Sequence, residues 1–371
     1  MLIAAPLALV FSLGIIRSHP EQIRPGVWAG NRVESLPLPT TGYKVYIVGE
    51  HHGLTENADF QLAYLRMLVD RTHLRDVALE EKSLYETDAQ SYIDGDAKPL
   101  PAALCLRASL LRGLRLLNSK LEPSKHVRIH LIDVDSPASA IHEHLLLLSK
   151  SIPHSDSVAV PRPADLKDHG EETVRRLEAL VSDQQVHSEL RTVGFAIRAL
   201  RDGFEVGTGP AKGSAYLEER EEAMTENLAE LIRRSGSGGV LVVCGFDHAS
   251  RRERKDGGPN RNQPFWPMAA RLESSGLRTF TIVTFPLSGE TFWRGTATQL
   301  PWGAADGHLS TGEKLSEVIL SAPSANFFYI DALKEHAQIP SEDVSHYGPD
   351  AFMLFPVAHP MLDECISVET H

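Results

Sequence analysis

Cysteine is scarce in this chain, with three residues among 371. They stand far apart, at Cys105, Cys244 and Cys365, and their number is odd. A disulfide framework or a zinc cluster would show close cysteine pairs, so we expect neither. Cys244 lies inside an apolar run, which indicates a buried and unreactive thiol.

Long apolar runs are also lacking beyond the first residues, MLIAAPLALVFSLGII. That stretch has about sixteen residues, whereas a membrane-spanning helix needs about twenty, so we expect no stable membrane span. Residues 1–30 are either an export signal or an ordered N-terminal element. No Lys or Arg precedes the apolar run, which favours the ordered element and a cytoplasmic location over export.

Positive charge is in deficit, because the net charge is −12 with the histidines neutral. A nucleic-acid-binding protein would carry a basic surface, so we exclude nucleic acid as a partner. The share of hydrophobic residues, 42%, and of charged residues, 23%, is ordinary for a globular protein. Seventeen histidines leave metal, haem and proton-transfer chemistry open.

Short apolar runs rich in Val, Ile and Phe predict seven buried strands. They are Val45–Val48, Val77–Leu79, Ile129–Val134, Val240–Val243, Phe280–Phe285, Asn326–Ile330 and Ala351–Phe355. Helical patterns separate most of them, as in βαβ units. The sequence therefore predicts an α/β fold with a mainly parallel central sheet flanked by helices.

Four segments have the apolar spacing of helices. They are residues 58–71, 102–121, 189–204 and 215–234. We expect residues 31–371 to form a single α/β catalytic domain with a helical insertion at about 84–215. Three prolines predict a loop over 151–168, and a polar, glycine-bearing stretch predicts another over 250–265.

Acidic residues and histidines follow four of the predicted strands. They are Glu50, His51 and His52 after the first, Glu80 after the second, Asp133 and Asp135 at the third, and Asp247 and His248 after the fourth. The carboxyl ends of parallel strands meet at one edge of a sheet, where open α/β folds bind their ligands. We expect Gly49 and Gly245 to let the chain turn sharply there and approach a ligand closely.

The expected site consists of Glu50, His52, Glu80 and His248, with the other polar residues at these ends as secondary candidates. Neighbours on an extended segment point to opposite sides, so only one of His51 and His52 enters the site. Whether it is His52 or His51 stays open.

These motifs resemble one superfamily. The run IVGEHHGLTENADFQLAYLRMLVDR, followed by VALEE, is similar to the first half of the group that contains ChaN-like haem-binding lipoproteins, TraB/Tiki proteases and erythromycin esterases. The signature of this group is Gly-Glu-x-His after one strand, followed by a later strand that ends in Glu. In this sequence the signature corresponds to Gly49, Glu50, His52 and Glu80. The spacing is closest to the ChaN-like and TraB members, because erythromycin esterases usually place an extra residue between the first Glu and His.

The second half of the chain resembles the same group. REEAMTENLAELI and VLVVCGFDHA are similar to its helix and its Gly-x-x-His strand end, which implies site roles for Arg220 and His248. YGPDAFMLFPVAHP resembles the closing strand of the esterase-like members. Arg220 precedes Met224 by four residues on the apolar stripe of the helix. It therefore either faces inward, toward Glu50 or a developing oxyanion, or is an exposed charge at the helix end.

The resemblance implies a hydrolase that activates water for attack on an ester or amide bond of a small molecule or peptide. In one version Glu50, His52, Glu80 and His248 hold a divalent metal, namely zinc, manganese or cobalt. In the other version a histidine is the general base and a carboxylate orients it. The alternatives are a haem- or metal-binding protein that uses the same edge, and a biosynthetic enzyme of acyl-transfer or lyase chemistry. The oligomeric state is left open.

Overall fold

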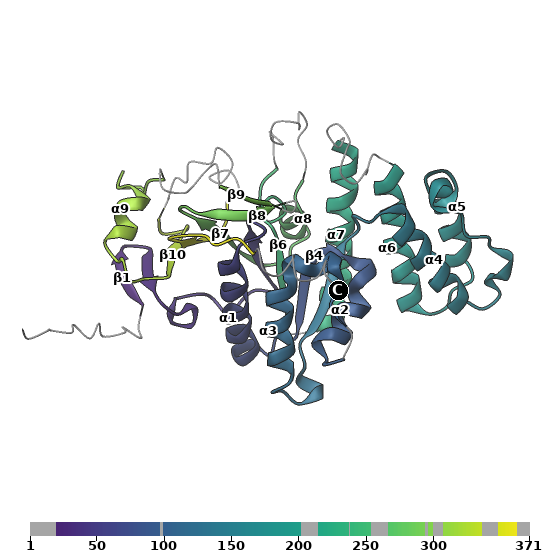
Figure 1. Ribbon diagram of the computed structural model, residues 1–371, viewed down its shortest axis with the longest axis horizontal. Helices are drawn as coiled ribbons and strands as arrows, with labels where there is room; N and C mark the ends of the chain where they lie inside the picture. Colours follow the sequence, from purple (N-terminus) through teal and green to yellow (C-terminus); the bar gives the residue numbers. More distant parts are fainter. Residues whose placement is uncertain are drawn as a thin grey trace, which may run out of the picture.

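A computed structural model of the chain shows one large mixed sheet between layers of helices (Figure 1). The described residues are 20–96, 99–201, 214–236, 238–253, 266–293, 296–299, 307–335 and 348–361. The nine strands of the sheet lie in the order β1-β2-β10-β11-β7-β3-β6-β4-β5. Their bounds are β1 Glu21–Arg24, β2 Val27–Gly30, β3 Val45–Glu50, β4 Asp76–Lys82, β5 Arg128–Asp133, β6 Val240–Gly245, β7 Thr279–Pro286, β10 Phe327–Asp331 and β11 Ala351–Phe355.

The central sheet is mainly parallel, which confirms the predicted α/β class. The run from β11 through β7, β3, β6 and β4 to β5 pairs in parallel throughout. At the other edge β10 is antiparallel to both β11 and β2, and β2 is antiparallel to β1. All seven predicted strands are present, and the prediction misses only the four-residue strands β1 and β2 of this sheet.

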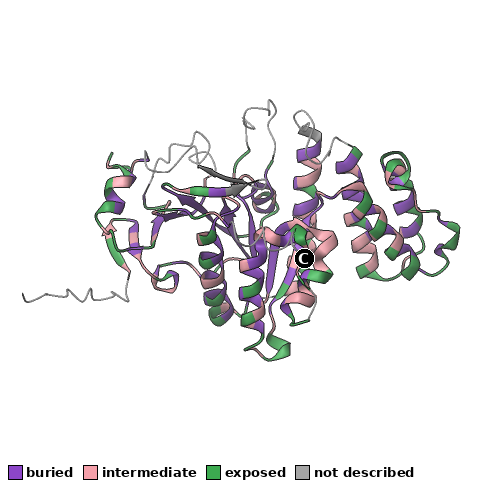
Figure 2. Cartoon of the chain, in the orientation of Figure 1, coloured by how far each residue is buried: buried purple, intermediate pink, exposed green. Residues whose placement is uncertain are grey.

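Helices cover both faces of the parallel part of the sheet. Alternate residues of the strands point to opposite faces, so each strand needs apolar side chains throughout. On one face, Tyr46 and Val48 pack with α1 (Thr55–Thr72) and α3 (Ala108–Asn118). On the other face, Val45 and Ile47 pack with α7 (Ser214–Ser235) and α8 (Met268–Ser274). Figure 2 accordingly shows buried strands between helices whose outer sides are exposed.

Three further helices pack together at one end of the molecule, beyond α7 (Figure 1). They are α4 (Ala138–Ser151), α5 (Leu166–Glu178) and α6 (Gln184–Arg201). Their shared apolar core also includes Tyr216 and Leu217 from α7, whereas Met224 and Leu228 of the same helix pack on the sheet. The helix α7 therefore joins this helical group to the sheet.

The remaining elements are short. They are α2 (Glu86–Ile93), α9 (Leu315–Leu320), the two-stranded sheet β8 (Glu290–Trp293) and β9 (Thr296–Gln299), and the 3-10 turns η1 (Val33–Ser35), η2 (Ser83–Tyr85), η3 (Ala102–Arg107), η4 (Pro123–Lys125), η5 (Ser155–Ser157) and η6 (Pro163–Asp165). Among the described helices, none is long and apolar enough to cross a membrane. Residues 1–19 lie outside the described part of the chain, and so do residues 254–265 of the second predicted loop.

Three expectations need correction. The predicted helix over 102–121 is a 3-10 turn, η3, followed by α3, because the backbone leaves the helical region at Arg107 (φ −111°, ψ 2°). The predicted loop over 151–168 contains the turns η5 and η6 and already enters α5 at Leu166. Cys105 is disulfide-bonded, whereas Cys244 is free and buried. Wide spacing in sequence therefore does not exclude a disulfide, because folding brings distant segments together.

Candidate functional site

The sheet order brings the four polar strand ends together. The strands β3, β6, β4 and β5 are consecutive neighbours, and Glu50 of β3 lies directly opposite Gly245 of β6. Glu80 follows on β4 and Asp133 ends β5. The predicted convergence of these strands at one edge is confirmed.

An irregularity in β4 sets the direction of its acidic residues. Leu79 pairs with Leu131 and Lys82 pairs with Asp133, so β4 has one residue more than β5 over this stretch. An extra residue of this kind bends a strand and re-aims its side chains, and it is common beside functional sites. Here the irregular stretch contains Glu80, whose carboxylate lies between the histidines of the two neighbouring strand ends.

The expectation that Gly49 and Gly245 are needed for a sharp turn of the chain is wrong. Gly49 and Gly245 lie inside paired strands and neither has a positive φ. Gly53 has the left-handed conformation instead, with φ 79°. Close packing explains Gly245, because a Cβ atom there would lie 2.9 Å from Nε2 of His52 and 3.2 Å from Oε2 of Glu80.

His52 lies in the site and its neighbour His51 does not. Nδ1 of His52 lies 2.9 Å from Oε1 of Glu50, and its Nε2 lies 3.9 Å from Oε2 of Glu80. About a quarter of the His52 side chain is exposed. The ring of His51 instead packs beside Phe246, and its partial burial lowers its pKa to about 4. The structure thus gives His52, rather than His51, a place among the carboxylates.

Glu50 is a buried carboxylate with three polar partners. Its Oε1 contacts Nη1 of Arg107 and Nδ1 of His52, and its Oε2 accepts a hydrogen bond from Nε2 of Gln61. Burial alone would raise the pKa of Glu50. The charge of Arg107 and the contacts with His52 and Gln61 outweigh this effect and hold the pKa below its ordinary value. Glu50 is therefore ionised at neutral pH.

Arg220 faces inward, and it ties Glu80 to Asp133 rather than to Glu50. Its Nε and Nη2 donate to the two oxygens of Asp133 at 2.8 and 2.7 Å, and Nη2 also donates to Oε1 of Glu80 at 2.5 Å. The backbone N–H of Gly245 donates to the other oxygen of Glu80 at 2.5 Å. Burial opposes the charge of Glu80, but the charges of His248 and Arg220 hold its pKa well below the usual range.

His248 lies between two buried carboxylates. Its Nδ1 contacts Oε1 of Glu221, and its Nε2 lies 3.0 Å from Oε1 of Glu80. Burial favours neutral His248, but these two charges raise its pKa to about 10. Nη1 of Arg220 lies 3.1 Å from the same Nε2. With both nitrogens protonated this is a contact of two donors. Nε2 of His248 and Nη2 of Arg220 both bind Oε1 of Glu80, which holds the two cations together.

Two other secondary candidates are Asp135 and Asp247. Asp135 is hydrogen-bonded to the hydroxyl of Tyr216, whose pKa is raised by burial and by this carboxylate. Asp247 is partly exposed in the turn after β6, where its carbonyl accepts from the N–H of Ser250 at 3.4 Å. The structure therefore joins Asp133 to the constellation through Arg220.

The sequence analysis misses three residues of the site, namely Arg107, Gln61 and Glu221. Glu221 is fully buried and its other oxygen accepts from the N–H of Met268 at 2.6 Å. Polar residues on an apolar helical stripe are a usable signal for two of them. Gln61 precedes Tyr64 by three residues and Glu221 precedes Met224 by three, so both face the core.

The described donors do not fit a divalent metal. Among the described residues, no group of three His, Cys, Asp or Glu side chains could hold a metal ion. The guanidinium of Arg220 lies among Glu80, Asp133 and His248, where it already neutralises the carboxylates and would repel a second cation. The metal and haem hypotheses stay predictions.

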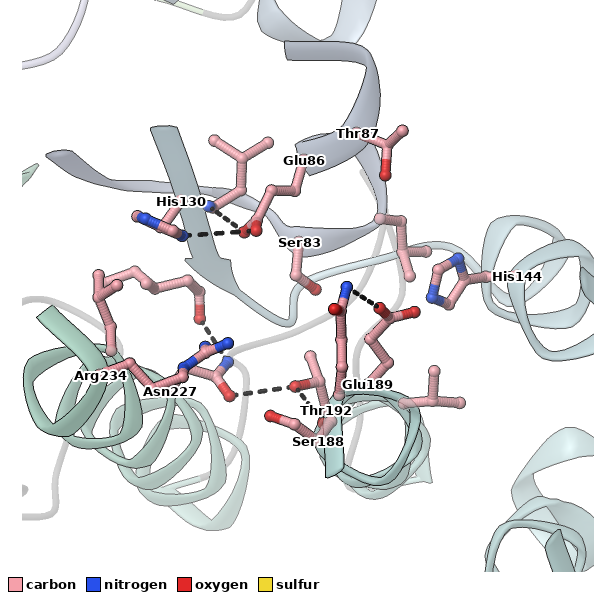
Figure 3. A pocket seen from close by; sticks show the side chains of 16 residues that line it. Ser83, Glu86, Thr87, His130, His144, Ser188, Glu189, Thr192, Asn227 and Arg234 are labelled. Carbon is pink, nitrogen blue, oxygen red and sulfur yellow. Dashed lines mark hydrogen bonds and ion pairs between the residues drawn. The ribbon is translucent and has the colours of Figure 1, made fainter. Parts of the chain in front are cut away.

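A cavity of about 170 Å³ lies apart from these residues, between β5, α2, α6 and α7 (Figure 3). Glu86 of α2 contacts His130 of β5, and Thr192 of α6 donates to Asn227 of α7 at 3.1 Å. Glu86 also accepts from the backbone N–H of Leu131 at 2.8 Å. These contacts pair backbone groups at the open edge of β5 and join α6 to α7. The polar lining of the cavity therefore has a structural role.

Comparisons with known proteins show the fold. Three solved structures resemble this one. A Bacillus cereus protein has a TM-score of 0.60 at 15% identity, over 86% of this chain and 90% of that chain. An erythromycin esterase mutant in its open conformation has a TM-score of 0.62 at 12% identity, over 87% and 93%. A succinoglycan biosynthesis protein has a TM-score of 0.61 at 12% identity, over 86% and 88%. No protein-family model and no curated protein matches the chain.

Proposed function

We propose that the protein is a hydrolase in which His52 is the general base for attack of water on an ester or amide bond. One observation carries this proposal. The buried, ionised Glu50 holds Nδ1 of His52, and Nε2 of His52 lies 3.9 Å from Oε2 of Glu80. The side chain of His52 is partly exposed. A base must combine a fixed orientation with access to the proton that it removes, and His52 has both.

The reaction follows from these positions. Nε2 of His52 takes a proton from water, and the water oxygen attacks the carbonyl carbon. Negative charge then develops on the carbonyl oxygen, next to the cations Arg220 and His248, which can stabilise it. The intermediate collapses as the bond to the leaving group breaks, and His52 returns its proton to the leaving oxygen or nitrogen. Glu50 stabilises the protonated imidazole throughout.

The resemblance to known proteins supports the same proposal. The motifs around Glu50, His52, Glu80 and His248 are similar to those of the Tiki/TraB/ChaN-like/erythromycin esterase-like superfamily, with spacing closest to the ChaN-like and TraB members. We propose that the chain belongs with this group. An erythromycin esterase, one of the solved structures of similar fold, is by its name an ester hydrolase.

A chelation assay separates the two versions of the mechanism. We expect the purified protein, freed of metal by a chelator, to hydrolyse small activated esters at its full rate, because the described base and cations need no metal. Turnover of p-nitrophenyl esters of graded chain length before and after chelation measures this. Loss of turnover on chelation and its return with zinc, manganese or cobalt would contradict the metal-free version. Absence of hydrolysis across esters and amides, with the haem absorption band or bound metal present instead, would overturn the hydrolase proposal.

A further inference from the structure

We propose that Arg107 is a positioning residue of this site and acts on His52 through the carboxylate of Glu50. The inference rests on the hydrolase proposal and assigns Arg107 a part in the same reaction. Arg107 lies 55 residues after His52 in sequence, yet the fold places the guanidinium directly against Glu50.

The local backbone explains how Arg107 reaches the site. It is the residue at which the 3-10 turn η3 ends and α3 begins, with φ −111° and ψ 2°. This break in the helical path points its side chain inward, and only 3% of the residue is exposed. A continuous helix over the same residues, as the apolar spacing predicts, would not contain this break.

One oxygen atom of Glu50 links Arg107 to the base. Oε1 of Glu50 contacts both Nη1 of Arg107 and Nδ1 of His52. On its other side, Nε of Arg107 donates to Oε1 of Glu81 at 3.0 Å. The planar guanidinium therefore spans two carboxylates, which a lysine ammonium cannot reproduce with the same geometry.

Burial makes this contact consequential. An ionised carboxylate that loses its cationic partner in the protein interior becomes neutral or moves to solvent. Glu50 would then no longer hold Nδ1 of His52 with a charge, and the ring could turn or change tautomer. Loss of the orienting carboxylate in a related arrangement, a serine protease triad, costs catalysis without destroying the fold. Arg107 is thus expected to affect turnover rather than substrate binding.

A double-mutant cycle in turnover tests the inference. Arg107→Met should lower kcat on the order of 10²-fold with KM nearly unchanged, because it disables the orientation of the base. In a Glu50→Gln background, Arg107→Met should lower kcat little further, since the group that it acts through is already altered. Arg115→Met is the matched control and should leave kcat unchanged. Arg115 is a half-buried arginine of the same α3 that donates to backbone carbonyls of residues 92–96 instead of to Glu50.

A second pair of variants, without the two carboxylate charges, separates an effect of Arg107 on folding from its effect on catalysis. Arg107→Met alone leaves the buried carboxylate of Glu50 and the half-buried one of Glu81 without their shared cation and can unfold the protein. The variants Glu50→Gln/Glu81→Gln and Glu50→Gln/Glu81→Gln/Arg107→Met lack these charges, and we expect them to have equal kcat and similar melting temperatures. Equal losses of kcat from Arg107→Met with and without Glu50, or full kcat in a folded Arg107→Met, would overturn the inference. If wild-type protein hydrolyses nothing, the hydrolase proposal itself fails instead.

Discussion

Gly245 shows how the site depends on a single missing side chain. Gly245 lies directly against His52 and Glu80, and an added Cβ would lie 2.9 Å from Nε2 of His52. We therefore expect Gly245→Ala to displace the ring and lower kcat/KM by roughly 10–100-fold, because displacements of about 1 Å have such effects on catalytic groups. The melting temperature should change little, since the nearest atom that must move is at the tip of the partly exposed His52 side chain.

The control for this variant is another glycine of the described chain. Gly194 lies in α6, and a Cβ there would lie 3.7 Å from Cγ1 of Val174, an ordinary contact. Gly194→Ala should leave kcat/KM unchanged and maintain or raise the melting temperature, because alanine favours a helix over glycine. Unchanged kcat/KM in Gly245→Ala would show that the tight approach of His52 to β6 has no catalytic role.

At the scale of elements, the pair formed by Glu221 and His248 docks α7 against the turn after β6. The pKa of His248 is raised to about 10, above the value near 6.5 of an unfolded histidine. Between these values the folded protein holds a proton that the unfolded chain releases, so the free energy of unfolding falls as pH rises from about 6.5 to 10. Below about pH 6.5 the contribution of this pair is fully present.

Urea unfolding across this pH range measures the effect. His248→Gln should reduce the downward slope of the unfolding free energy between pH 7 and 10, and it should also destabilise the protein because Glu221 loses its cation. His169→Gln, at an exposed position on α5, should leave the slope unchanged. A slope that is the same in wild type and His248→Gln would show that His248 is not held protonated by its carboxylates.

At the scale of the whole molecule, local pattern predicts much of the fold. Strands buried on both faces require continuous apolar runs, so β3 and β6 are visible in the sequence together with the polar residues that end them. Strand direction is not visible, because β10 is an apolar run like the parallel strands and yet is antiparallel to both neighbours.

The candidate site is predicted only in part, because local sequence patterns do not show which distant segments the fold brings together. Glu50, His52, Glu80 and His248 carry a local signal, since each follows an apolar run. Arg107 carries none, because its partner Glu50 is distant in sequence and the break in the helix that points it inward follows from packing. For Arg220 the sequence allows both an inward and an exposed position. Its partners are Glu80 and Asp133, which only the order of the strands brings within reach.

The most direct test of the account is the turnover and melting temperature of His52→Ala. General-base catalysis by a positioned side chain typically supplies 10²–10⁴-fold in rate. We therefore expect His52→Ala to lose at least about 10²-fold in kcat/KM on the best ester substrate. Its melting temperature should stay close to that of wild type, because the side chain is partly exposed and Glu50 keeps Arg107 and Gln61 as partners. Glu80→Gln should likewise lose turnover while remaining folded. A His52→Ala protein that melts at a lower temperature but keeps wild-type turnover in its folded fraction would contradict the account.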